Sequence, residues 1–209
     1  MRIIAGEARG RIIEAPAGRN TRPTLDRVRE NIFNMIQGDV ASSRVLDLFA
    51  GSGALSLEAL SRGADFAVMV DHDRKACEIQ QRNLTALRYQ ERARLIRSDW
   101  KAALATLRQD GERFGLVFLD PPYRMTDLRD VFGGLFPLLD RDAIVVLEHE
   151  AGKTPDVTEN YRVVKDRAWG FCAAWATQLS RFASRSISVS SSSSAEPTSS
   201  ATSSASLVA

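Results

Sequence analysis

The chain has 209 residues, of which 44% are hydrophobic and 26% are charged, and its formal net charge is +2. This composition is typical of a soluble globular protein with a core and excludes a chain that is disordered throughout. No apolar run is long enough to span a membrane and no signal-type N-terminus is visible, so we expect a cytoplasmic protein. The two cysteines, Cys77 and Cys172, lack metal-like spacing, and we expect reduced thiols.

The first twenty residues predict a small arginine-rich hairpin with a turn near Arg9-Gly10. A hairpin of this size is marginal alone, so its isoleucines should pack on the core while its arginines face outward. Arginine suits phosphate contacts, which makes residues 1–20 a candidate RNA-docking extension. The alternative is a solvated surface that happens to be rich in arginine. The isoleucines are Ile3, Ile4, Ile12 and Ile13, and the candidate RNA-binding residues are Arg2, Arg9, Arg11 and Arg19.

An extended link over Thr21-Arg22-Pro23-Thr24 leads into a predicted helix. We expect Thr24 to be the N-cap of this helix, because threonine is favoured where the first free N–H groups need an acceptor. The apolar face of the helix consists of Val28, Ile32, Met35 and Ile36.

Apolar runs and helical patterns then alternate along the chain. Strands are predicted at 44–49, 67–71, 93–97, 114–119 and 143–148, and helices at 54–60, 73–87, 100–108 and 128–139. A closing hairpin is predicted from 161–165 and 171–177. This alternation predicts an α/β fold, with an open, mostly parallel sheet, helices on both faces and a C-terminal antiparallel hairpin. The domain spans 21–183, and the serine-rich residues 184–209 are predicted to be a disordered tail.

A glycine-rich turn and three acids at successive strand ends indicate a cofactor site. Gly51 and Gly53 allow a ligand to approach the backbone, although Ser56 replaces the third glycine of a dinucleotide fingerprint. Asp47, Asp71 and Asp99 would suit an ammonium group, ribose hydroxyls and an adenine amine, respectively. These three groups describe S-adenosylmethionine better than they describe NAD.

The fourth strand end carries Asp120-Pro121-Pro122-Tyr123. Proline has no N–H, so carbonyls of this stiff loop are available as acceptors. Asp120 and one carbonyl can accept the two hydrogens of an exocyclic amine, and Tyr123 offers a flat face for its ring. A proline-rich turn with an incidental acid is the simpler alternative.

Two motifs together resemble a known family. The segments Asp47–Gly53 and Asp120–Tyr123 look like those of the amino-methyltransferases. The N-terminal segments, from Met1-Arg2-Ile3-Ile4-Ala5-Gly6 through Thr21-Arg22-Pro23-Thr24 to Asp26-Arg27-Val28-Arg29-Glu30, are similar to one family among them. It is the bacterial 16S ribosomal RNA guanine-N2 methyltransferase family that modifies guanine 966. The match runs from Met1 to about Leu147, and the serine-rich tail departs from the family pattern.

The resemblance implies a Rossmann-like S-adenosylmethionine-dependent methyltransferase fold, the 16S rRNA of an assembling small subunit as substrate, and a monomer. It implies that Asp120, Pro121, Pro122 and Tyr123 are catalytic. The implied cofactor-binding residues are Asp47, Phe49, Ala50, Gly51, Ser52, Gly53, Asp71, His72, Asp99, Trp100, Arg22 and Thr24. His72 and His149 are isolated, so no metal is expected.

Three other functions remain open from the sequence. Another amino-methyltransferase acting on RNA or DNA bases would share the Asp-Pro-Pro-Tyr loop. A dinucleotide-dependent oxidoreductase would share the sheet, the glycine turn and Asp71, but it would not need that loop. An RNA-binding protein with a relic cofactor fold would need no methyl transfer at all.

Overall fold

The computed structural model describes residues 1–15, 23–122, 125–153, 160–169 and 172–179, with the side chains of residues 23–25 left aside. The predicted tail at 184–209 lies outside these described residues. The predicted site residues Arg19, Arg22 and Tyr123 also lie outside them. In the described part of the chain, no helix combines the length and apolar character needed to cross a membrane.

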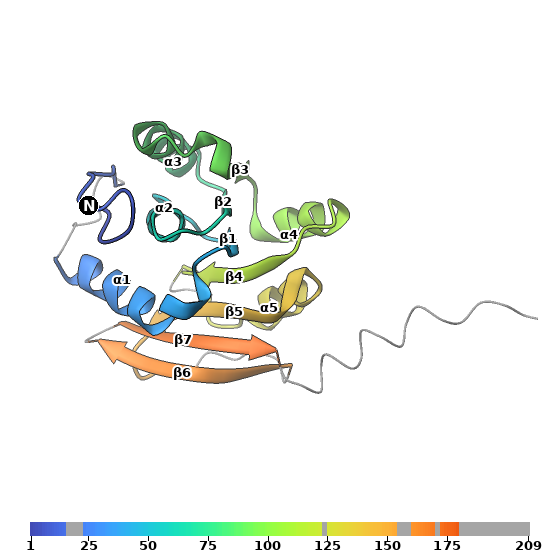
Figure 1. The fold of residues 1–209 in the computed structure, drawn as a ribbon. Coiled ribbons are helices and arrows are strands. Elements are labelled where there is room, and N and C mark those ends of the chain that lie inside the picture. Colours follow the sequence, from blue (N-terminus) through green and yellow to red (C-terminus); the bar gives the residue numbers. More distant parts are fainter. Residues whose placement is uncertain (16–22, 123–124, 154–159, 170–171, 180–209) are drawn as a thin grey trace, which may run out of the picture.

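Within the described residues, seven strands form one sheet in the order β3-β2-β1-β4-β5-β7-β6, and Figure 1 shows this order. The first five pair in parallel, and β7 pairs antiparallel with both β5 and β6. The strands are β1 (Arg44–Asp47), β2 (Phe66–Asp71), β3 (Ala93–Arg97), β4 (Phe114–Leu119), β5 (Leu139–Glu150), β6 (Tyr161–Trp169) and β7 (Cys172–Leu179). The predicted mostly parallel sheet with a C-terminal antiparallel hairpin is therefore confirmed.

Helices cover both faces of this sheet (Figure 1). The helices are α1 (Pro23–Met35), α2 (Ala54–Ser61), α3 (Arg74–Leu87), α4 (Trp100–Gln109) and α5 (Arg129–Leu135). Short 3-10 turns lie at Gln37–Asp39, Gln90–Arg92 and Phe136–Leu138. Alternate residues of β4 show the two layers: Phe118 packs in the cluster with α1, α2 and α3, whereas Val117 packs in the cluster with α4 and α5.

Several predicted boundaries are corrected. Thr24 is not the N-cap of α1, because the helix already begins at Pro23, where proline costs no helical hydrogen bond. The first strand ends at Asp47 rather than Phe49, since the chain turns there toward the glycines. Helix α5 ends at Leu135, and Pro137 lies in the 3-10 turn that follows.

The N-terminal segment folds back on itself, but less regularly than predicted. It contains a single antiparallel bridge between Arg2 and Ile12. Ile3 and Ile13 are buried in the core as expected, whereas Ile12 is 81% exposed and does not pack inward. Because side chains alternate along an extended chain, neighbouring Ile12 and Ile13 point to opposite sides.

A buried carboxylate attaches this segment to helix α2. Glu58 of α2 is fully buried and accepts hydrogen bonds from the backbone N–H groups of Ile4 (2.8 Å) and Ala5 (3.0 Å). It also pairs with Arg62 Nε at 2.8 Å and lies 3.7 Å from Arg29 Nε. Burial lowers the pKa of Arg29, while Glu58 and Asp26 oppose that shift. Arg29 is therefore a core residue rather than part of a basic surface.

Candidate active site

The four predicted acids lie at one edge of the sheet. Asp47 and Asp71 end β1 and β2, Asp99 follows β3, and Asp120 follows β4. Because these four strands are neighbours and parallel, their carboxyl ends meet at the same edge, which is where open α/β sheets bind ligands.

The glycine turn after β1 is held in a conformation that only glycine fits easily. Gly51 and Gly53 have φ values of 54° and 79°. A Cβ on Gly53 would lie 2.1 Å from Met69 Cε, so the helix must pass close to the sheet without a side chain there. Two polar residues of α3 hold the turn from behind: Gln80 Nε2 donates to the Gly51 carbonyl at 2.9 Å, and Asn83 Nδ2 donates to the Ser52 carbonyl at 3.1 Å.

Asp47 is a buried carboxylate that is only half satisfied. Ser56 Oγ donates to Asp47 Oδ2 at 2.9 Å, and Oδ1 has no partner among the described residues. Burial raises the pKa of Asp47 to about 7, against the effect of the Ser56 hydrogen bond. Ser56 stands at the third glycine position of a dinucleotide fingerprint, so its hydroxyl serves Asp47 there. An unpartnered carboxylate oxygen behind a glycine turn fits a ligand that carries a positive charge.

Asp71 connects two loops as well as facing the site. Its Oδ2 accepts the Gly51 N–H at 2.8 Å, and its Oδ1 accepts the Asp73 N–H at 2.9 Å. A carboxylate has about four acceptor positions, so two remain for ribose hydroxyls. His72 lies 3.6 Å from Asp71 Oδ1 through its Nδ1, with a side chain that is 74% exposed.

Asp99 is the N-cap of α4. Its Oδ1 accepts from the backbone N–H groups of Lys101 (3.0 Å) and Ala102 (3.1 Å), and the residue is exposed. The structural role of Asp99 thus uses one carboxylate oxygen. Trp100 and Phe49 are half-buried beside the core layer of α4 and α5.

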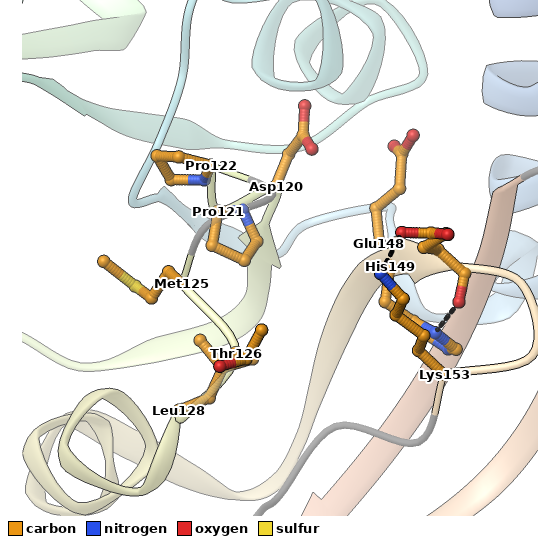
Figure 2. Close-up of a pocket in the computed structure, with 10 residues that line it drawn as sticks. Asp120, Pro121, Pro122, Met125, Thr126, Leu128, Glu148, His149 and Lys153 are labelled. Atoms are coloured by element: carbon orange, nitrogen blue, oxygen red, sulfur yellow. Dashed lines mark hydrogen bonds and ion pairs between the residues drawn. The ribbon is translucent and has the colours of Figure 1, made fainter.

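The Asp120 loop forms one wall of a pocket of about 360 Å³, shown in Figure 2. No described residue donates to the Pro121 carbonyl. The Pro122 carbonyl accepts the Met125 N–H at 2.7 Å and so closes the turn. This corrects the prediction that the carbonyls of the loop are available as acceptors. The pocket is lined by Asp120, Pro121, Pro122, Met125, Thr126, Leu128, Glu148, His149, Glu150 and Lys153.

Three pocket residues on β5 were not predicted as site residues: Glu148, His149 and Glu150. We expected Glu148 only as the end of a strand and His149 only as an isolated histidine, because neither belongs to a recognisable motif. Glu148 Oε1 accepts from Cys172 Sγ at 3.1 Å, and the His149 ring packs edge-on against Trp175 with centroids 5.0 Å apart. The strand pairing of β5 with β4 is the signal that reveals them, and it is a long-range contact.

The described N-terminal arginines are exposed, and one of them has a structural contact. Arg2, Arg9 and Arg11 are all exposed. Arg11 Nη2 also donates to the carbonyl of Ala86 at the end of α3. Among the described residues, no group of three or more histidine, cysteine, aspartate or glutamate side chains could hold a metal ion.

A family model described as "Conserved hypothetical protein 95" matches residues 1–178. The "Putative rRNA methyltransferase YlbH" of Bacillus subtilis is 41% identical over 152 residues, which cover 72% of this chain and 83% of the relative. The "Ribosomal RNA small subunit methyltransferase D" of Escherichia coli is 36% identical over 173 residues, covering 81% of this chain and 85% of that protein.

The solved structure of "Putative methyltransferase yhhF from Escherichia coli" superimposes with a TM-score of 0.75 at 36% identity. The match covers 86% of this chain and 97% of that structure. The predicted Rossmann-like methyltransferase fold is thereby confirmed.

Proposed function

The chain belongs to the family described as conserved hypothetical protein 95, and from this premise we propose that it transfers a methyl group from S-adenosylmethionine to the N2 amine of guanine 966 in 16S ribosomal RNA. Relatives named as rRNA methyltransferases support the reaction class and the RNA substrate. The guanine amine and its position follow from the resemblance of the N-terminal and Asp120 motifs.

One observation carries the proposal. Asp120 directly follows β4, which pairs with β1, and β1 carries Asp47 and leads into the glycine turn. A cofactor held by the turn therefore lies beside an acceptor group held by the Asp120 loop. The methyl donor and the amine would meet between neighbouring strands.

S-adenosylmethionine is the cofactor, and the residues around the turn fit its parts. Asp47 would accept a hydrogen bond from the ammonium group of the cofactor, because Asp47 Oδ1 has no partner among the described residues. Asp71 would accept from the ribose hydroxyls, and the exposed carboxylate of Asp99 would accept from the adenine amine. The bound cofactor supplies an activated methyl group on a sulfonium centre.

The chain's contribution to the reaction is to position and polarise the target amine. The lone pair of a guanine amine is delocalised into the ring, so the amine is a poor nucleophile. Asp120 and the Pro121 carbonyl would accept its two hydrogens, which localises the lone pair on nitrogen and stabilises the positive charge that develops there. Tyr123, which lies outside the described residues, would stack on the base. The target must be unpaired or flipped to reach this loop.

The N-terminal segment would bind the RNA around the target. Arg2 and Arg9 present exposed guanidinium groups, while Arg11 divides its donors between solvent and the Ala86 carbonyl. With Arg19 they would contact phosphates of the RNA. The substrate would be a small-subunit assembly particle, and the protein would act as a monomer in the cytoplasm.

The test is methyl transfer to small ribosomal subunits that lack the modification, followed by digestion and mass analysis of the nucleosides. We expect N2-methylguanosine as the labelled product. N6-methyladenosine or N4-methylcytidine would assign the same loop to a different base, and NAD binding without methyl transfer would assign the sheet to an oxidoreductase.

A further inference from the structure

A second carboxylate, that of Glu148, lines the same pocket as Asp120. Leu119, the last residue of β4, pairs with Leu147 of β5, so Asp120 directly after β4 and Glu148 of β5 occupy the next matching positions. Neighbouring strands lie about 4.8 Å apart, and matching positions project to the same face. Figure 2 shows the two carboxylates on the same side of the pocket.

Two other charged residues that line the pocket form an ion pair with each other. Glu150 Oε2 and Lys153 Nζ form an ion pair at 2.6 Å, and both residues are exposed. The apolar side chains of Pro121, Met125 and Leu128 supply the walls. Asp120 and Glu148 are two further carboxylates of the lining, and Asp120 is exposed.

Glu148 is held in place by a thiol. Cys172 lies on β7, and its Sγ donates to Glu148 Oε1 at 3.1 Å. Burial, followed by the charges of Glu148 and Asp120, raises the pKa of Cys172 far above its ordinary value. The thiol therefore remains protonated at neutral pH and continues to act as a donor. Glu148 is thus fixed by the strand ladder on one side and by Cys172 on another.

Two adjacent carboxylates match one base edge better than the others. Guanine presents N1–H beside its N2 amine, so the N1–N2 part of its Watson–Crick edge consists only of donors. Adenine presents an acceptor at N1, and cytosine presents an acceptor at N3 next to its amine; a carboxylate facing either lone pair would be left unpaired. A site built to accept a hydrogen bond can reject an analogue that lacks the donor by large factors.

We propose that Glu148 is a specificity-determining residue that accepts the N1–H of the target guanine while Asp120 accepts from its N2 amine. This inference rests on the proposed function, since it assigns the second acceptor of the same pocket. Asp120 acts on the reacting nitrogen, whereas Glu148 selects the base that carries it.

The test uses 2,6-diaminopurine, a base that keeps the N2 amine but has an acceptor at N1. Small subunits are reconstituted with 16S rRNA that carries either guanine or 2,6-diaminopurine at the target position, and kcat/KM for methyl transfer is measured on both. For the wild-type protein we expect a preference for guanine on the order of 10² to 10⁴. Glu148→Gln should reduce this preference at least about tenfold, because the glutamine amide can donate to the diaminopurine N1.

The readout is a ratio within one protein, so partial loss of folded protein cancels. Glu150→Gln is the matched control, since it neutralises a lining carboxylate that is paired with Lys153, and its ratio should stay at the wild-type value. Should Glu148→Gln fail to fold, Glu148→Asp keeps the charge and withdraws the acceptor by one methylene, which should lower kcat/KM on guanine more than on diaminopurine.

The failures are distinguishable. An unchanged ratio in the Glu148 variants, with guanine still methylated at N2, overturns the role of Glu148 and leaves the proposed function intact. Methylation of neither base at N2 by the wild-type protein overturns the proposed function itself.

Discussion

The backbone N–H of Gly51 donates to Asp71 Oδ2 over 2.8 Å and so joins the turn after β1 to the end of β2. The same carboxylate accepts the N–H of Asp73 at the start of α3. Asp71 thus fixes the shape of the cofactor turn before any ligand binds, in addition to the contacts proposed with the ribose.

Replacing Asp71 by alanine should weaken S-adenosylmethionine binding by about 1.5–3 kcal/mol, the range for hydrogen bonds to a charged group. Isothermal titration calorimetry would record this as a Kd increase of roughly 10- to 150-fold. Asp65→Ala is the control, because Asp65 is an exposed acid just before the opposite end of β2. Equal affinities in wild type and Asp71→Ala would mean that the ribose is held elsewhere.

Cofactor binding should depend on pH through Asp47. The pKa of Asp47 is raised from 3.8 to about 7, so the folded protein keeps a proton that the unfolded chain has already lost. The free energy of unfolding should therefore fall as pH rises from about 4 to about 7 and level off above that. An ammonium partner needs the ionised carboxylate, so affinity should weaken as pH drops below about 7, by at most about tenfold per unit.

Asp47→Asn should remove both trends, because an amide does not titrate. Calorimetric titrations of both proteins with S-adenosylmethionine across this pH window check the binding part, and urea unfolding checks the stability part. Parallel pH profiles for wild type and Asp47→Asn would show that another group controls them.

The buried Glu58 should be among the largest single contributions to stability. Glu58→Ala leaves Arg29, Arg62 and two backbone N–H groups without their shared acceptor. Removing one partner of a buried ion pair costs about 3–5 kcal/mol. Urea unfolding monitors this loss as a lower midpoint, with the exposed Glu91→Ala as the control. A change below about 1 kcal/mol would contradict the role of Glu58 as the attachment of the N-terminal segment.

Arg9 tests the RNA-docking surface, because it is exposed whereas Arg11 also contacts Ala86. Arg9→Ala should weaken RNA binding for all sequences and reduce the log–log salt slope by about 0.7–0.9, the value for one lost phosphate contact. Filter binding over a salt series measures it. Arg141→Ala, an exposed arginine near the start of β5, should keep the wild-type slope. A wild-type slope in Arg9→Ala would place docking elsewhere.

The sheet and the position of the four acids at one of its edges could be predicted because they depend on local patterns. The β2 and β4 strands are short apolar runs, and Asp73 caps α3 through the Ala76 N–H as its position predicts. The prediction that Ile12 packs on the core was wrong. The single bridge between Arg2 and Ile12 is too short to fix which isoleucines turn inward.

The residues that were missed depend on contacts between distant segments. Glu58 accepts hydrogen bonds from residues more than fifty positions away in the sequence. Gln80 donates to the carbonyl of Gly51, which is 29 positions away. Glu148 lines the pocket beside Asp120 because of the register of β5 with β4 and its contact with Cys172 on β7. No local pattern in the sequence contains this information.

Asp120 is the residue on which the proposed chemistry depends. Asp120→Ala should lower kcat for methyl transfer by a factor on the order of 10² to 10³, since it removes a charged acceptor that acts mainly in the transition state. The Kd for S-adenosylmethionine should stay near the wild-type value, because the proposed partner of Asp120 is the target amine and not the cofactor. The matched control for turnover is Asp142→Ala, because Asp142 is an exposed acid near the start of β5, at the end away from the pocket.

The most direct measurement is the transfer of labelled methyl groups from S-adenosylmethionine to unmodified small ribosomal subunits by wild type and Asp120→Ala, with nuclease mapping of the labelled nucleotide. The account predicts label on N2 of guanine 966 with the wild-type protein and a rate at least about 10²-fold lower with Asp120→Ala. Label on another base, or near-wild-type turnover by Asp120→Ala, would contradict it.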